Sequence, residues 1–290
     1  MGRGKYMIRE YKAGQVVEKS KFWVPEQTKR RSPKRASSTH RKQDQNERDA
    51  IKRLARSINC NFVHGDLWIT LKLDTAGYKA VQDKAGAWET DVEFLNAVRK
   101  ELKHQAELFL RRLSRAIEKD GLTLKYIMVI SDMSGKTGEV VRPHCHILMT
   151  RVAFELCERQ WKLGTVDYQI LKDQPDYTPL AVYMLRQVRR QPDEKKWTPS
   201  RNLDKPVITE TVVEDAGPLV TPRGALSLAQ GEYDIETGSH YIRYVPKRFL
   251  FQKKNTAGTG TKPNASNKSV SGVNSFRPSS VSGNGTGGGA

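Results

Sequence analysis

Two histidines in the run 142–150, Arg-Pro-His-Cys-His-Ile-Leu-Met-Thr, are the residues with the clearest chemical potential in this chain. The apolar stretch after His146 predicts a buried strand, and a proline is tolerated only near the first residue of such a strand. Residues i and i+2 of a strand point to the same face, so His144 and His146 present two imidazoles side by side while Cys145 faces the other way. Neutral imidazoles are common ligands of divalent metals. The run therefore predicts half of a metal site, although two histidines can also fall at this spacing by chance.

A tyrosine on a downstream helix is the second group with chemical potential. Thr178 and Pro179 predict a helix start, with threonine at the N-cap and proline in the first turn, and the pattern continues to about residue 191. One face of this helix is apolar. The other face carries four polar side chains at helical spacing: Tyr183, Arg186, Gln187 and Arg190. A tyrosine hydroxyl among guanidinium groups is well suited to a site beside a phosphodiester.

The charge balance of the chain indicates a polyanionic partner. Its 290 residues include 50 Lys+Arg against 32 Asp+Glu, which gives a net charge of +18 and a pI of about 9.8. Nucleic acid is the default partner of such a chain, with a membrane surface as the competitor. No apolar run of about 18 residues or signal-like start is present, so we expect a cytoplasmic protein. The three cysteines are an odd number without metal-ligand spacing, which suits a reducing compartment.

Hydrophobic periodicity predicts the elements that position these groups. Strands are expected over residues 66–74, 122–131 and 140–150, and helices over 44–56, 91–119 and 153–161. The strand 122–131 is apolar on both faces, which is typical of a central position. The strand 140–150 is expected to pair back onto it as a hairpin. The histidines would then lie beside the strand that leads to Asp132.

The two ends of the chain have a different composition from its middle. Residues 1–45 are polar and basic, which predicts a disordered arm that contacts nucleic-acid phosphates or is merely solvated. Residues 46–250 form the expected principal domain, within which 207–250 show short strand patterns typical of a small β extension. Residues 251–290 are rich in Gly, Ser, Asn and Thr, which predicts a flexible tail.

A Gly-Lys-Thr run at 135–137 does not indicate a nucleotide-binding phosphate loop. That motif needs a glycine five positions before the Gly of this run, and position 130 is isoleucine. It also needs a helix to follow, and here a strand is expected. The sequence therefore predicts no ATPase site.

Three segments, in this order, resemble a known family of enzymes. They are the alternating strand that begins at Asp66, the run with His144 and His146, and the helix that carries Tyr183. Together they resemble the three motifs of the HUH endonucleases, and more narrowly the rolling-circle replication initiators of phages and plasmids. The later segment 200–203, Ser-Arg-Asn-Leu, followed by Pro206, is similar to a segment downstream of the tyrosine in that group. The resemblance covers about residues 48–250.

The resemblance implies a fold and an activity. The fold would be α+β, with a compact central antiparallel sheet of ferredoxin/RRM-like type flanked by helices, and 46–250 would be the nicking endonuclease domain. The activity would be site-specific nicking and joining of single-stranded origin DNA, with a covalent 5′-phosphotyrosine link and a free 3′-OH that primes synthesis. Because the chain shows no helicase motif, a host helicase and polymerase would be partners.

The resemblance also implies roles for individual residues. His144 and His146 would bind Mg²⁺ or Mn²⁺ with a third acidic or amide ligand, and Tyr183 would attack the scissile phosphate. Tyrosine has an ordinary pKa of about 10, so the phenolate needs stabilisation, which Arg186 could supply. Family members often carry lysine near the tyrosine; a guanidinium holds a phosphate as well but does not readily shuttle a proton. Tyr177 and Tyr168 are the alternative nucleophiles.

The third metal ligand has two acidic candidates. Asp132 would follow the strand beside the histidine strand and so point its carboxylate at the same site, whereas Glu139 lies on the predicted hairpin. Either could instead be an ordinary turn residue. Side chains expected to contact DNA are Lys72, Arg142, Gln187, Arg190 and Arg201.

Two other classes of function compete with a replication initiator. An HUH transposase or relaxase would share the chemistry, but relaxases tend to place the tyrosine before the histidines. A non-enzymatic basic DNA-binding protein with structural zinc would need four closed Cys/His ligands. Here Cys145 faces away from the histidines and no Cys-x-x-Cys pair occurs, which disfavours that class.

Overall fold

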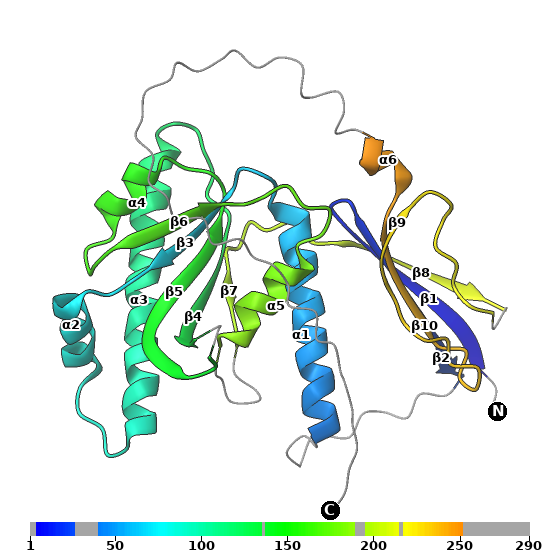
Figure 1. The fold of residues 1–290 in the computed structure, drawn as a ribbon, viewed down its shortest axis with the longest axis horizontal. Coiled ribbons are helices and arrows are strands. Elements are labelled where there is room, and N and C mark those ends of the chain that lie inside the picture. The colour runs from blue at the N-terminus through cyan, green and yellow to red at the C-terminus, as the bar shows by residue number, and fades with distance from the viewer. Residues whose placement is uncertain (1–3, 27–39, 135–136, 189–194, 215–216, 252–290) are drawn as a thin grey trace, which may run out of the picture. The chain divides into compact units, whose positions relative to one another are not determined.

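The computed structural model of the chain describes residues 4–26, 40–134, 137–188, 195–214 and 217–251. Within these residues the protein is α+β, with two antiparallel five-stranded sheets and six helices (Figure 1). The predicted class, an antiparallel sheet flanked by helices, is confirmed. The second complete sheet was not anticipated.

The first sheet carries the histidine strand at its centre, in the order β6-β3-β5-β4-β7. Its strands are β3 (Leu67–Leu71), β4 (Tyr126–Met133), β5 (Val140–Met149), β6 (Val166–Ile170) and β7 (Thr198–Pro199). The predicted hairpin is confirmed, because β5 pairs antiparallel with β4, with His146 opposite Val129 and His144 opposite Ser131. On its other side β5 pairs with β3, where Thr70 is the partner of His146.

Alternation along the strands separates two cores on opposite faces of this sheet. Cys145 and Ile147 belong to the core covered by α2 (Thr75–Ala85), α3 (Asp91–Glu118) and α4 (Phe154–Gln160). Leu148 belongs to the core covered by α1 (His40–Asn61) and α5 (Thr178–Arg186), which lies on the face that the histidines share. Cys145 therefore does face away from the histidines, as the period of the strand requires.

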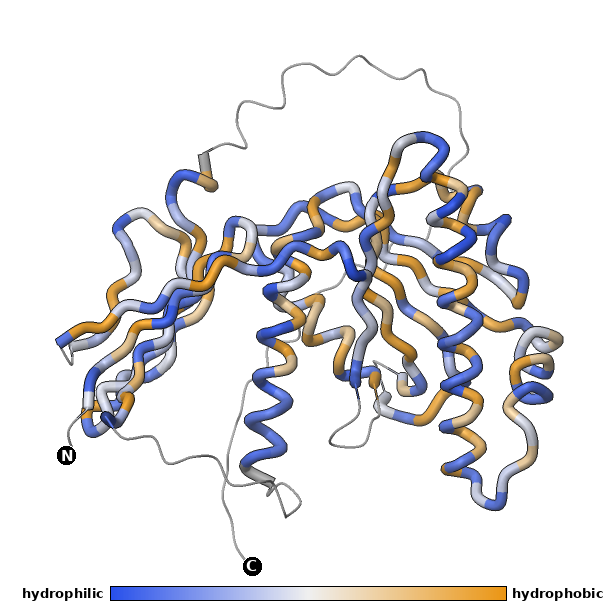
Figure 2. The backbone as a smooth tube through the Cα atoms, turned by 180° about the vertical axis from the view of Figure 1, so that it is seen from behind, coloured by the Kyte–Doolittle hydropathy of each residue, from blue (hydrophilic) through white to orange (hydrophobic). Residues whose placement is uncertain are grey.

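A side-chain cap marks the start of α3. The hydroxyl of Thr90 accepts from the backbone of Glu93 at 3.3 Å and donates to the carboxylate of Glu93 at 2.9 Å. Helix α3 alternates hydrophilic and hydrophobic residues along its length, whereas residues 42–49 of α1 are hydrophilic (Figure 2). Helix α1 is longer than predicted because its polar start carries no hydrophobic period.

The predicted start and end of α5 need correction. Tyr177, not Thr178, is the N-cap residue, and Thr178 donates from its backbone amide and its hydroxyl to the carboxylate of Asp176, at 3.0 and 2.7 Å. The helix ends at Arg186 rather than near residue 191.

The N-terminal segment is not a disordered arm over residues 4–25. It forms a hairpin of β1 (Gly4–Ala13) and β2 (Val16–Pro25).

The region 207–250 supplies β8 (Val207–Val213), β9 (Leu226–Gln230), β10 (His240–Val245) and a short α6 (Lys247–Phe251). These strands join the hairpin into one sheet, in the order β8-β1-β2-β10-β9, so the expected extension is not a separate unit. The apolar partners of Val17 are Ile242 and Tyr244 from the far end of the chain, which is why the hairpin alone looks too polar to fold. Residues 27–39 and 252–290 lie outside the described part.

Buried ion pairs connect this second sheet to α1 and to a residue just before α5. Glu18 is only 2% exposed and accepts from Arg56 of α1 at 2.6 and 3.1 Å. Removing one partner of a buried pair leaves an uncompensated charge at a cost of about 3–5 kcal/mol. Arg243 of β10 similarly pairs at 3.3 Å with Asp176, whose carboxylate also receives Asn59 of α1 at 2.9 Å.

We expect the backbone amides of residues 7–11 to be protected from hydrogen exchange. Strand β1 lies between β2 and β8, so its successive amides donate alternately to the two neighbouring strands. They exchange only when the sheet opens. Exchange measured peptide by peptide with mass spectrometry checks this expectation. Exchange at the rate of an unstructured peptide would restore the disordered-arm interpretation of this segment.

Candidate active site

The two histidine side chains meet on the α1/α5 face of the first sheet. Their Nε2 atoms are 3.1 Å apart and the ring planes are nearly perpendicular, at 87°. His146 is buried, with 6% of its surface exposed, and its ring stacks on Trp68 of β3 at 4.9 Å between centroids. His144 is half-buried, which leaves the paired nitrogens close to the surface.

Hydrogen bonds at the other ring nitrogens orient both imidazoles. His144 donates from Nδ1 to the carbonyl of Arg142 at 3.1 Å, and a carbonyl only accepts, so its Nε2 keeps a free lone pair. Nδ1 of His146 is 2.9 Å from the hydroxyl of Thr70, the partner of His146 across the sheet. Outer hydrogen bonds of this kind are typical of metal-binding histidines, because they fix the tautomer and the ring orientation.

Gln187 supplies a third donor atom. Its Oε1 lies 3.3 Å from Nε2 of His146, and its Nε2 donates to the carbonyl of Tyr183 at 3.2 Å. The second bond assigns the amide nitrogen and so turns the amide oxygen toward the histidines. Gln187 is 3% exposed at the C-cap of α5, four residues after Tyr183. From the sequence alone Gln187 is expected to contact DNA, and its spacing of four residues from Tyr183 is the signal that the two share one side of the helix.

These three donors fit a small divalent cation. Mg²⁺ binds ligands in octahedral geometry at about 2.0–2.1 Å, which places neighbouring ligands roughly 3 Å apart. Nε2 of His146 lies 3.1 Å from Nε2 of His144 and 3.3 Å from Oε1 of Gln187, which matches this distance between neighbouring ligands. Within the described residues no group of three His, Cys, Asp or Glu side chains could hold a metal, and the amide oxygen of Gln187 lies outside that set of residue types.

Burial keeps both imidazoles in the form that binds metal. It lowers the pKa of His146 to about 3 and also lowers the pKa of His144 below its usual range. The neighbouring charge of Lys72 acts in the same direction on both rings. The histidines are therefore neutral near pH 7, and a cation need not displace protons from them.

Tyr183 lies beside the three donors, on the inward side of α5. Its ring is half-buried, 6.5 Å from His146 and 6.1 Å from Trp68 between centroids. The two alternative tyrosines are placed differently. Tyr177 is 4% exposed and donates its hydroxyl to the carbonyl of Lys172 at 2.9 Å, and burial raises its pKa to about 12.

Tyr168 is the other alternative nucleophile. It pairs with Ile69 across the sheet, so it shares the face opposite to the histidines. Its ring packs on Phe154 at 3.9 Å between centroids. Tyr183 is thus the one of the three candidates that contacts His146.

The two acidic candidates for the third ligand are each paired with another side chain. The fully buried carboxylate of Asp132 pairs with Arg99 of α3, and its charge also acts on His144, where it opposes the lowering of the pKa by burial. Glu139 is exposed and accepts from the hydroxyl of Thr137 at 2.9 Å. Asp132 follows Ser131 at a bulge near the end of β4 and stays a candidate ligand beside Gln187.

The expected DNA contacts are scattered around the site. Lys72 is exposed near both histidines and pairs with Asp167. The guanidinium of Arg142 lies 4.6 Å from the ring centre of Tyr78. Arg186, which was expected to stabilise the phenolate of Tyr183 and not to contact DNA, is exposed at the end of α5. Arg201 is exposed after β7, close to Tyr126 at the start of β4 and so away from the histidines. Arg190 lies outside the described residues.

Comparison with known proteins adds no assignment. No protein-family model, no curated protein and no solved structure matches the chain. Among the described residues, no helix has the length and apolar character needed to cross a membrane. The interpretation of the site consequently depends on its geometry and on the motif resemblance.

We expect Gln187→Ala to weaken Mn²⁺ binding about tenfold or more, because it removes one of three protein donors. Calorimetric titration of the purified protein with Mn²⁺ measures this change. Glu139→Gln is the matched control and should leave the affinity unaltered. Should the control lose affinity and Gln187→Ala retain it, the third ligand would be Glu139.

Proposed function

We propose that this protein nicks single-stranded DNA at a replication origin through a metal-assisted tyrosine nucleophile and initiates rolling-circle replication. One observation carries the proposal. His144 and His146 from β5, and Gln187 and Tyr183 from α5, come together on one face of the sheet although the two elements are far apart in sequence. This set of groups is the one that the resemblance to HUH endonucleases implies.

The metal would bind and activate the scissile phosphate. The two imidazoles and the amide of Gln187 would hold a divalent cation, which would supply Lewis-acid stabilisation of charge on the scissile phosphate. All three of these protein donors are neutral, so they would not reduce the charge that the cation offers to the phosphate.

The tyrosine would form the covalent intermediate. The phenolate oxygen of Tyr183 attacks the phosphorus, the bond from phosphorus to the 3′ oxygen breaks, and that oxygen leaves as a 3′-hydroxyl after taking up a proton. The 5′ phosphate remains linked to the tyrosine. The free 3′-OH can prime a polymerase, and the phosphotyrosyl bond conserves the energy needed to rejoin the strand.

The basic character of the chain supports a nucleic-acid substrate. The net charge of +18 favours association with a polyanion, and Lys72 lies close to the paired histidines. A structural zinc site is less well supported, because such a site needs four closed ligands and the nearest thiol, that of Cys145, is buried in the core on the other face of the sheet.

We expect Tyr183→Phe to abolish formation of a covalent adduct with single-stranded DNA, because the ring is retained and only the attacking oxygen is lost. The protein is incubated with strands from its own replicon and Mn²⁺, and the adduct is resolved by denaturing gel electrophoresis. EDTA should abolish the adduct as well.

Tyr168→Phe is the matched control for this experiment, and it should form as much adduct as the unaltered protein. An adduct that persists in Tyr183→Phe and disappears in Tyr168→Phe would move the nucleophile to the other face of the sheet. No adduct on any strand would contradict the proposed enzyme.

A further inference from the structure

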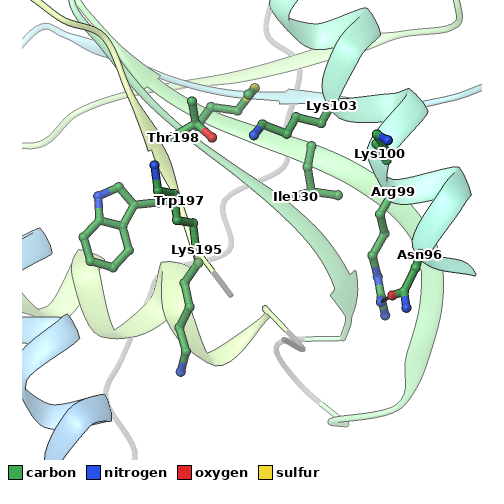
Figure 3. A pocket seen from close by; sticks show the side chains of 10 residues that line it. Asn96, Arg99, Lys100, Lys103, Ile130, Lys195, Trp197 and Thr198 are labelled. Carbon is green, nitrogen blue, oxygen red and sulfur yellow. Dashed lines mark hydrogen bonds between the residues drawn. The ribbon is translucent and has the colours of Figure 1, made fainter. Parts of the chain in front are cut away.

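A cationic cavity lies apart from the histidine site, between α3 and the segment 195–198 that leads into β7 (Figure 3). Its volume is about 420 Å³, and Met128 and Ile130 of β4 contribute an apolar floor on the α3 face of the sheet. Five lining side chains are cationic: Arg99, Lys100, Lys103, Lys195 and Lys196. None of the described residues that line the cavity is acidic.

Helical spacing explains why α3 contributes so many of these cations. Arg99, Lys100 and Lys103 lie three, four and seven residues after Asn96, which places all four on one side of the helix. Figure 3 shows them in a row along α3, with Lys103 extending toward Thr198. Lys195 comes from the segment across the cavity, so the positive charge is presented from two sides.

Acidic neighbours compensate only part of this charge. Arg99 pairs with Asp132, and Lys103 and Lys196 each lie 3.8 Å from a glutamate outside the cavity. Lys100 and Lys195 make no ion pair with a described acidic side chain, and both are exposed.

One buried donor in the cavity also lacks a partner. The Nε atom of Arg99 has no hydrogen-bond acceptor among the described residues. Like charges gathered around a hollow repel one another, and a bound anion relieves that repulsion. The cavity therefore has the chemistry of an anion site.

The arrangement favours a phosphodiester strand over a free nucleotide. The cations are spread along α3 and the opposite segment rather than directed at one point. The indole of Trp197 turns away from the cavity toward the α1/α5 core, so no aromatic ring is offered to a base (Figure 3). Contacts to phosphates position a nucleic-acid strand but do not distinguish its bases.

We propose that this cavity binds phosphates of a single-stranded DNA segment, as an accessory site on the face of the sheet opposite to the histidines. The identity of the strand rests on the proposed function, since it would be the strand on which Tyr183 acts. The end of β4 joins the two sites. Asp132 holds Arg99 in the cavity, and its own backbone amide donates to the carbonyl of Gln187 at 3.4 Å. A strand bound at the histidines would pass around this end of the sheet to reach the cavity.

The test is the salt dependence of DNA binding by the double variant Lys100→Gln, Lys195→Gln. Fluorescence anisotropy with a labelled single-stranded oligonucleotide gives the affinity at several salt concentrations. Each phosphate contact in a single strand contributes about 0.7 to the slope of log affinity against log salt, so the loss of both should reduce the slope by about 1.4. The matched control is Lys79→Gln, Lys162→Gln, which removes the same charge from exposed positions outside the cavity and should keep the original slope. Circular dichroism establishes that both variants are folded.

Equal slopes for the double variant and the unaltered protein would overturn the inference, as would an equal loss in the control. Inorganic triphosphate is the second probe: if the double variant loses triphosphate binding but keeps its full affinity for the oligonucleotide, the cavity is a site for a free phosphate compound. Adduct formation by the unaltered protein reports separately on the proposed function. If the unaltered protein forms an adduct but the double variant keeps the original slope, only the accessory site is contradicted. If the slope falls but no adduct forms, the proposed enzyme activity is contradicted and the cavity remains a DNA contact.

Discussion

The packing of α5 against the central strand β5 is the constraint on which the site depends. His146 is enclosed on one side by the ring of Trp68 and on another by the amide of Gln187, while Thr70 fixes its far nitrogen. This enclosure keeps the imidazole neutral, because burial opposes the charged form. The same packing brings the ring of Tyr183 to the histidines, so that one helix delivers both the amide oxygen and the phenol. A displacement of α5 would separate all of these groups at once.

The start of α5 is held from outside the first sheet. Asp176 receives the first backbone amide of the helix and also pairs with Arg243 of β10 and with Asn59 of α1. A buried carboxylate needs several partners to offset its desolvation, and here the partners come from distant segments. Strand β10 therefore has a structural part in the site, because its Arg243 helps to anchor the helix that carries Tyr183.

The central sheet separates two candidate sites, one for a cation and one for phosphate anions. On one face neutral donors are poised for a cation, and on the other a row of lysines and an arginine lines a hollow. Asp132 neutralises Arg99, which is one of the five cations that line the cavity. Under the proposed function, one face would break the DNA backbone while the other held a neighbouring part of the strand.

The sequence by itself determined the local features with a strong period or a specific end signal. The alternation around His144 and His146 and the hairpin that contains them depend on residues close in the chain. The tertiary structure decided whatever depends on distant partners. The hairpin 4–25 looked disordered because its apolar partners Ile242 and Tyr244 lie at the other end of the chain. Strand adjacency made the position of Asp132 predictable, while its pairing with Arg99 of α3 was not. The amide oxygen of Gln187 lies beside His146 because α5 packs on that face. Periodicity encodes which way a side chain points within its own element, but contacts between elements are set by packing that no single segment contains.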